Sequence, residues 1–266
     1  MENIVDLSQF TIGAEIEFYL FAQNGGLIAD LDTGKFPTKR YTIFSEYLEA
    51  LAALRAEISA KYSFQDESGA GQFEVDFAPV SDALQLANQI IEFKEFAMQV
   101  AEMNGFSLSF AAKPISHQPG NALHIHYCNE VFDPYGLQAN NGVMDIRVAN
   151  NNDYIQWAIG GILAQTKENA QLFYTVENDL SRFEPWFNAP TKICWGGNNR
   201  SVALRIPDAK PKRIEHRLAC ADVAPLPLLK HIIAAADYGM QNRVAPPAKV
   251  FGNAWEDKYD FERIFG

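Results

Sequence analysis

Two segments of the chain alternate between hydrophobic and polar positions, as a half-buried strand does. Residues 11–21 and 71–79 both place hydrophobic side chains at every second position and mainly acidic ones between them. The hydrophobic positions are Ile12, Ala14, Ile16 and Phe18 in the first segment and Phe73, Val75 and Phe77 in the second. Each segment is predicted to be a strand with one buried face and one acidic face.

Longer segments carry hydrophobic residues at helical spacing. Residues 45–62 begin with a possible capping serine, Ser45, and residues 81–105 begin with Ser81 and end with Gly105. Serine favours the start of a helix and glycine its end. Further helices are predicted near 151–175 and 225–243. Shorter strands are predicted at 106–112, 122–128, 192–195, 201–206 and 213–219.

The order of these elements indicates an α+β fold. Strands come in pairs and helices at intervals, without a regular strand–helix–strand repeat, so we expect a largely antiparallel sheet backed by helices. Residues 1–266 show no internal repeat, low-complexity tract or linker that would divide them. A single domain is therefore the simpler interpretation.

Composition narrows the classes of partner. The chain has 48% hydrophobic residues and a formal net charge of −11, which repels phosphate backbones and anionic lipid. We expect no nucleic acid and no membrane partner. The three cysteines are scattered, the first residues do not resemble a secretory signal, and no apolar run is long enough to span a bilayer. These features indicate a cytoplasmic protein with reduced thiols.

The acidic residues include two pairs that suit a divalent cation. Glu15 and Glu17 lie two residues apart on a predicted strand, so their carboxylates project from the same face. Glu67 and Glu74 flank a glycine-rich turn before the second strand. A solvated strand face and an ordinary turn are the alternatives, but a cation relieves the repulsion of neighbouring carboxylates.

Histidines and basic residues add further candidates. His124 and His126 share one face of a short apolar segment near Gly120. This arrangement is equally consistent with a metal or phosphate site and with two histidines that bind no ligand. Several cations surround a single carboxylate, Glu215; they are Arg200, Arg205, Lys210, Arg213 and Arg217. Carboxylates for cations and guanidinium groups for anions are what metal-assisted phosphoryl transfer from a nucleotide requires.

These stretches, in this order, resemble the catalytic domain of the glutamine synthetase family. The segments that carry the resemblance are GAEIEF, ESGAGQFE, KPISHQPGNALHIH, APTKICWGGNNRSVALRIP and RIEHRLACADVAPLPLL. The similarity runs from about residue 11 to residue 245. Phe73 and Pro119 resemble the branch that contains γ-glutamyl polyamine ligases. The resemblance implies a curved, mainly antiparallel sheet backed by helices, with the carboxylates on its concave face.

The resemblance also implies roles for individual residues. Two cations, Mg²⁺ or Mn²⁺, would be held by two sets of ligands, one of Glu17, Glu67 and Glu74 and the other of Glu15, His124 and Glu215. ATP phosphates would contact His126, Arg205, Lys210 and Arg213, and the phosphoryl group in transit would contact Arg200. The acid substrate would bind Arg182, Arg217 and the backbone at Gly120. The implied reaction forms an acyl phosphate on glutamate or a related acid, which an amine then attacks.

The sequence departs from the family pattern at three places. Asn188, in PWFNAPT, stands where the family has a glutamate that takes a proton from the incoming amine, and an amide cannot act as that base. The resemblance begins at the first metal strand, without a counterpart of the family's smaller N-terminal domain. The long C-terminal segment of the family has no counterpart either.

Two functional hypotheses remain open at this stage. The first is an ATP-dependent carboxylate–amine ligase, acting on small-molecule substrates with an amine other than ammonia. The second is a non-catalytic homologue that binds a nucleotide, an amino acid or a partner subunit. Either protein could form a homo-oligomer or associate with a separate chain that supplies the N-terminal domain.

Overall fold

A computed structural model describes residues 7–22, 25, 56–61, 71–103, 105–132, 151–184 and 189–265. The strands in this part of the chain are β1 (Phe10–Ala22), β2 (Ala56–Lys61), β3 (Gln72–Val80), β4 (Phe106–Ser109), β5 (Leu123–Asn129), β6 (Trp195–Gly196), β7 (Leu204–Arg205) and β8 (Ile214–His216). The α-helices are α2 (Ala83–Met103), α3 (Asn151–Thr166) and α4 (Pro225–Asn242). Short 3₁₀ helices cover Glu130–Phe132, Ala170–Leu172 and Glu177–Arg182.

The described strands form one open sheet in the order β2-β3-β1-β5-β8-β7-β6, and β4 pairs with one end of β1. All neighbours are antiparallel except β6 and β7, so the sheet is mixed rather than purely antiparallel. The first strand in the sequence is central, because β1 pairs with β3 on one side and with β5 on the other. The expected α+β sheet backed by helices is confirmed.

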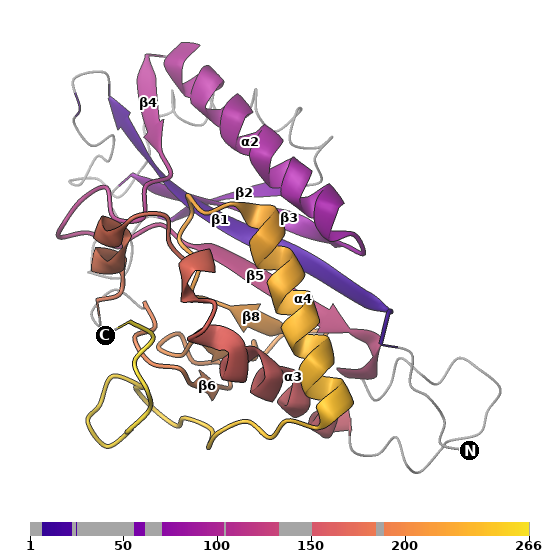
Figure 1. The fold of residues 1–266 in the computed structure, drawn as a ribbon. Helices are drawn as coiled ribbons and strands as arrows, with labels where there is room; N and C mark the ends of the chain where they lie inside the picture. Colours follow the sequence, from indigo (N-terminus) through magenta and orange to yellow (C-terminus); the bar gives the residue numbers. More distant parts are fainter. Residues whose placement is uncertain are drawn as a thin grey trace.

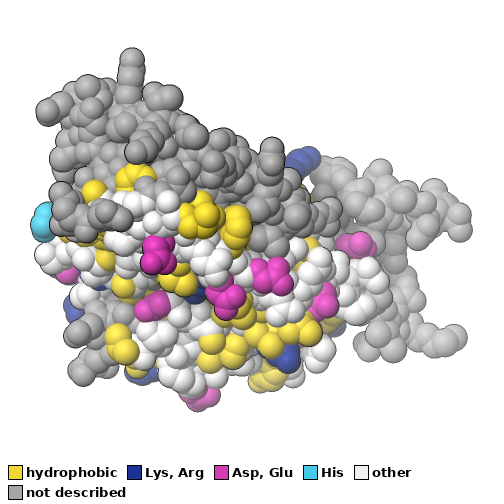
Figure 2. Space-filling model, turned by 90° about the horizontal axis from the view of Figure 1, so that it is seen from above, with side chains coloured by type: hydrophobic (Ala, Val, Ile, Leu, Met, Phe, Trp, Pro, Cys, Tyr) yellow, Lys and Arg dark blue, Asp and Glu magenta, His cyan; other side chains and the backbone are white. Residues whose placement is uncertain are grey.

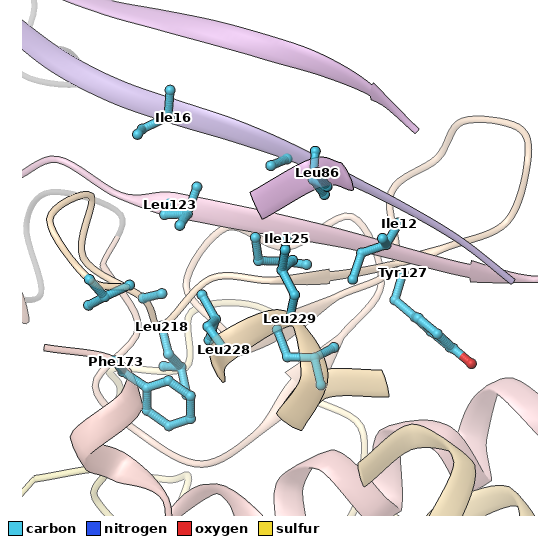
Figure 3. Packing of buried hydrophobic residues seen from close by; sticks show 14 of the residues in the cluster. Ile12, Ile16, Leu86, Leu123, Ile125, Tyr127, Phe173, Leu218, Leu228 and Leu229 are labelled. Carbon is cyan, nitrogen blue, oxygen red and sulfur yellow. The ribbon is translucent and has the colours of Figure 1, made fainter. Parts of the chain in front are cut away.

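The helices α2 and α4 lie over one face of the sheet (Figure 1). Ile12, Ile16 and Ile125 are fully buried and belong to one core with Leu86 of α2 and Leu228 of α4. Figure 3 shows these side chains between the strands and the helices. Because side chains alternate between the two faces of a strand, the acidic positions of β1 and β3 must point away from this core.

The helices α3 and α4 approach each other closely at two glycines. A Cβ atom on Gly161 would lie 2.2 Å from the carbonyl oxygen of Ala235 and 2.5 Å from Cα of Gly239. These contacts are backbone atoms, which cannot rotate away as a flexible side chain can. The two helices therefore pack at this distance only because neither residue has a side chain.

Gly161→Ala is expected to destabilise the chain, because the added methyl group forces the two helices apart. Overpacking of this kind costs about 1–3 kcal/mol. Urea unfolding followed by circular dichroism measures the change in the free energy of unfolding. An unchanged unfolding midpoint would show that α3 and α4 do not pack as closely as described.

The helix α4 also carries an acidic residue that opposes folding at neutral pH. Asp237 accepts a hydrogen bond from Tyr127 Oη at 3.3 Å. Partial burial raises the pKa of Asp237, and the hydrogen bond from Tyr127 offsets only part of that rise. A raised pKa means that the folded chain binds the proton more tightly than the unfolded chain, so this stabilisation is present at low pH and is lost as pH rises through the folded pKa.

Asp237→Asn is expected to raise the melting temperature slightly at pH 7, since the amide removes the buried charge and keeps an acceptor for Tyr127. Below the pKa of Asp237 the gain should shrink, because the wild-type carboxyl is then neutral as well. Thermal unfolding of both proteins at a series of pH values from 7 downward measures how the difference shrinks. Equal gains across this series would contradict the assigned cause.

Several sequence predictions need correction. Residues 56–61 form a strand, β2, although helical spacing was expected over 45–62; the rest of that segment lies outside the described residues. Pairing of Ser59 with Glu74 and of Ile58 with Val75 along β3 outweighs a helix propensity of only tenths of a kcal/mol per residue. At the start of α2, the capping side chain is Asp82 rather than Ser81, because its Oδ1 accepts a hydrogen bond from the Leu84 amide at 2.8 Å.

Other predictions are confirmed with shifted ends. The helix expected over 81–105 is α2, and Gly105 follows it with a left-handed backbone, φ 75°. The helix expected near 151–175 stops as an α-helix at Thr166, and α4 agrees with the segment expected near 225–243. The strands expected over 192–195, 201–206 and 213–219 are only two or three residues long, as β6, β7 and β8.

The surface agrees with the acidic composition. Figure 2 shows acidic and hydrophobic side chains interspersed on the described part of one face, with few basic ones.

Among the helices in the described ranges, none has the length and apolar character needed to cross a membrane.

Candidate active site

The face of the sheet opposite the helices carries rows of acidic and histidine side chains. Glu17 of β1 lies opposite Glu74 of β3, and Glu15 of β1 lies opposite His124 of β5. Two residues along β5 from His124, His126 lies opposite Glu215 of β8. Glu215 in turn lies opposite Arg205 of β7. Residues from five strands are therefore brought together by antiparallel pairing and the two-residue period of the strand.

Two overlapping groups of these side chains have the spacing of metal ligands. Glu15, His124 and Glu215 each offer one ligand atom, and these atoms lie within 4.8 Å of one another. Glu17, Glu74 and His124 do the same. His124 belongs to both groups, so the two candidate positions are adjacent.

The protonation of these groups suits a cation. Burial alone raises the pKa of the Glu15 carboxyl, but the hydrogen bonds that it accepts from His124 and His126 outweigh burial and hold that pKa well below its usual range. Burial, together with the positive charge of Arg217, lowers the pKa of His124. At neutral pH the site therefore presents an ionised carboxylate beside a neutral imidazole, the form of histidine that ligates metals.

Glu215 is fully buried and holds two guanidinium groups. Its Oε2 accepts a hydrogen bond from Arg205 Nη1 at 2.6 Å, and its Oε1 accepts one from Arg217. Burial raises the pKa of Glu215, but the charge of Arg217 outweighs burial and lowers that pKa to about 2. The carboxylate thus remains ionised and holds the guanidinium groups of Arg205 and Arg217 beside the cavity.

The hydrogen bonds of His126 determine its tautomer. Arg213 donates from Nε to Nδ1 of His126 at 3.1 Å, so Nδ1 carries a lone pair. The other nitrogen, Nε2, lies 2.7 Å from Oε1 of Glu15 and donates its proton there. His126 therefore links the basic residues to the acidic group and orients Glu15.

Gly120 lies where only a glycine fits. A Cβ atom there would be 2.4 Å from the carbonyl oxygen of Ala112 and 2.6 Å from Cγ of Arg182. The Arg182 guanidinium donates to the backbone carbonyls of Leu218 at 3.0 Å and Arg217 at 3.2 Å. The stem of Arg182 thus packs against the Gly120 backbone, and its guanidinium group holds the chain that follows β8.

A cavity of about 560 Å³ joins these residues. Its lining includes nearly all predicted site residues that the structure describes: Glu15, Glu17, Glu74, Gly120, His124, His126, Arg182, Arg200, Arg205, Arg213, Glu215 and Arg217. Lys210 is exposed and does not belong to the lining, although the neighbouring Asp208 and Ala209 do. Glu67 and Asn188 lie outside the described residues.

The structure adds three residues that the sequence interpretation did not select. Asp76 lies opposite Glu15 and forms a third acidic group with Glu15 and Glu74. Asn198 lines the cavity and accepts a hydrogen bond from Arg205 Nε at 3.0 Å. Gln72 lines the cavity beside Glu17. Asp76 shares the alternating pattern of Glu74 and could have been found from it. Gln72 lies in the segment ESGAGQFE that resembles the family, but the resemblance assigned no role to it or to Asn198.

The donor set fits a hard or borderline divalent cation. Carboxylate oxygens are the preferred ligands of Mg²⁺ and Mn²⁺, and one imidazole is compatible with Mn²⁺. The adjacent guanidinium groups of Arg205, Arg213 and Arg217 would in turn attract an anion, so the cavity presents both charge types to a ligand.

Comparison with known proteins agrees with this geometry. A sequence profile described as "Glutamine synthetase, catalytic domain" matches residues 4–263. An alignment of 268 residues with glutamine synthetase of Thermococcus kodakarensis shows 30% identity. This alignment covers 95% of this chain and 56% of that protein. The chain is 29% identical over 256 residues to γ-glutamylethanolamide synthetase GlnA4 of Streptomyces coelicolor, covering 92% of this chain and 54% of the relative.

A further relative, γ-glutamylputrescine synthetase PuuA of Escherichia coli, is 29% identical over 196 residues, or 72% of this chain and 40% of that protein. The chain therefore spans about half the length of the relatives that it matches over nearly its whole length.

Solved structures share the fold. Apo GmaS superposes with a TM-score of 0.74 at 24% identity, covering 96% of this chain and 59% of the other. Plasmodium falciparum glutamine synthetase gives a TM-score of 0.73 at 18% identity, and the superposition covers 90% of this chain and 53% of the other. Sequence profile, relatives and fold agree, and the chain belongs to the glutamine synthetase family through its catalytic domain.

Proposed function

We propose that this protein is an ATP-dependent ligase that joins the side-chain carboxylate of glutamate, or of a related acid, to an amine. The observation that carries the proposal is the pair of adjacent Glu/His groups, which share His124 and open into the same cavity as Arg200 and Arg205. Cation ligands next to guanidinium groups suit a reaction in which two anions, a carboxylate and a nucleotide phosphate, approach each other.

The residues divide into groups with different tasks. Glu15, His124 and Glu215 would hold one Mg²⁺ or Mn²⁺, and Glu17, Glu67 and Glu74 the other. Bound cations would neutralise phosphate charge and polarise the transferred phosphoryl group. The proposed nucleotide-binding residues are His126, Arg205, Lys210 and Arg213, with Lys210 at the rim because it does not line the cavity.

The acid substrate would bind near Gly120, Arg182 and Arg217. Arg200, which is exposed at the cavity, would contact the phosphoryl group in transit. Transfer of the ATP γ-phosphoryl group to the carboxylate gives ADP and an acyl phosphate. Attack by the amine then forms the amide, and phosphate leaves as the amine loses its proton.

We propose an organic amine as the acceptor. Two relatives are synthetases of γ-glutamylputrescine and γ-glutamylethanolamide, whose amide nitrogens come from amines larger than ammonia. The neutral Asn188, at the position where the family has its glutamate base, also favours an acceptor other than ammonium. We further propose that residues 1–266 act as one catalytic domain.

ADP release tests the proposed function directly. The purified chain is incubated with Mg²⁺ or Mn²⁺, ATP, glutamate and each member of a panel of amines that includes putrescine, ethanolamine, methylamine and ammonium. ADP release that requires both glutamate and an amine, with the amide detected by mass spectrometry, is the expected result. Tight binding of Mg–ATP by calorimetry without turnover for any pair would instead support a non-catalytic homologue.

A further inference from the structure

Two buried carboxamides, those of Gln72 and Asn121, lie between the acidic face and the Gly120 backbone. Gln72 is 1% exposed and Asn121 is fully buried. Gln72 lies on β3 opposite Tyr19 of β1, one step along the same face from the pair formed by Glu74 and Glu17. Tyr19 also contacts the backbone next to Gly120, because its hydroxyl donates to the carbonyl oxygen of Pro119 at 2.8 Å.

The surroundings of Asn121 determine which end of its amide faces Gln72. Its Nδ2 donates to the carbonyl oxygens of Ser109 at 3.1 Å and Ala111 at 2.9 Å. An amide NH₂ group has two hydrogens, and both are used in these bonds. The acceptor Oδ1 must therefore face Gln72, where it lies 3.1 Å from Nε2.

Three acceptors surround the Gln72 NH₂ group. Besides Asn121 Oδ1, Nε2 lies 3.0 Å from the carbonyl oxygen of Gly120 and 3.4 Å from Oε2 of Glu17. A carboxylate at this position would meet three oxygens without a hydrogen to share, and an apolar side chain would leave buried acceptors without their donor. The site thus requires a neutral donor of this length.

The same contacts restrain a proposed cation ligand. Oε2 of Glu17 also accepts a hydrogen bond from the Ala122 amide at 3.0 Å. Fixing one oxygen of a carboxylate fixes the orientation of the whole group. Glu17 therefore enters the group with Glu74 and His124 already oriented, as partners beyond the ligands commonly achieve in metal sites.

We infer that Gln72 is a positioning residue that orients Glu17 for a divalent cation and the Gly120 carbonyl for the acid substrate. This inference rests on the proposed function, because it assigns Gln72 to the cation and acid positions named there. It predicts that loss of the Gln72 amide weakens cation binding and acid binding together, while ATP binding at Arg205 and Arg213 changes little.

The test compares Gln72→Met with the matched variant Gln89→Met. Methionine has a similar length and volume without a donor. Gln89 is also a buried glutamine, 8% exposed, but it lies on α2 in the helix layer. Titration of the full chain with MnCl₂ by calorimetry, without nucleotide or acid, measures the dissociation constant independently of turnover.

Gln72→Met is expected to weaken at least one Mn²⁺ binding step by about 10-fold or more, the usual effect of losing a partner that orients a ligand. Its KM for the acid should rise while its KM for ATP stays near the wild-type value. Gln89→Met should bind Mn²⁺ as the wild type does. If Gln72→Met does not fold, Gln72→Asn, which keeps the NH₂ but shortens its reach, should show the same direction of change.

Two results would overturn the inference. Wild-type Mn²⁺ affinity in Gln72→Met, or in the folded Gln72→Asn, would refute the role of Gln72 while leaving the proposed function intact. Absence of Mn²⁺ binding by the wild-type chain would refute both, because the cation site itself would then be missing.

Discussion

Glu215→Gln is expected to abolish ligase turnover and to destabilise the folded chain by about 3–5 kcal/mol. The substitution removes the buried negative charge that is hydrogen-bonded to both Arg205 and Arg217. Removing one partner of a buried ion pair has this cost because it leaves the other charge without compensation. It also deletes an oxygen ligand from the group with Glu15 and His124.

A matched control separates these effects from the loss of any glutamate charge. Glu256 is also paired with a cation, Lys258 at 2.8 Å, but this pair lies on the surface. Glu256→Gln should change neither ADP release nor the urea midpoint, because solvent screens such pairs. If Glu215→Gln retains wild-type turnover, the assignment of Glu215 to the site is wrong.

Asn188→Glu is expected to raise the rate of amide formation with ammonium by about 10²-fold or more. A general base in the right position contributes about 10²–10⁴-fold, and a carboxylate can accept the ammonium proton whereas an amide cannot. Ala189, the next residue in the chain, lines the cavity. The rate of ADP release at saturating glutamate and ammonium measures the effect.

Asn188→Gln is the matched control, because it has the length of the glutamate without its charge. It should leave the ammonium rate unchanged. A gain in both variants would attribute the effect to side-chain length rather than to proton transfer. No gain in Asn188→Glu would mean that the proton of the amine leaves by another route.

The strand patterns predicted much of the fold. A two-residue period assigns Glu15 and Glu17 to one face of β1, and the resemblance to the family joined Glu74 of the neighbouring strand to Glu17. The resemblance to the family joined His124 and Glu215 to them, and both lie within ligand distance in the structure.

Other features depend on contacts that a local pattern does not contain. The segment AEISAK belongs to a stretch with helical spacing but becomes β2, because the edge of β3 offers it a partner. Gln72 and Asn198 are polar residues of ordinary types, and only their positions beside Glu17 and Arg205 give them significance. Sequence spacing does not reveal which amide meets which carboxylate.

The central place of β1 has a consequence for biosynthesis. This strand precedes all its partners in the chain, yet one neighbour, β5, begins only at Leu123, and the acidic face is completed by β8 at Ile214–His216. Pairings between residues far apart in sequence slow folding, because the chain must close large loops first. We therefore expect β1 to leave the ribosome only partly paired, and the acidic face to form only after β8 has emerged.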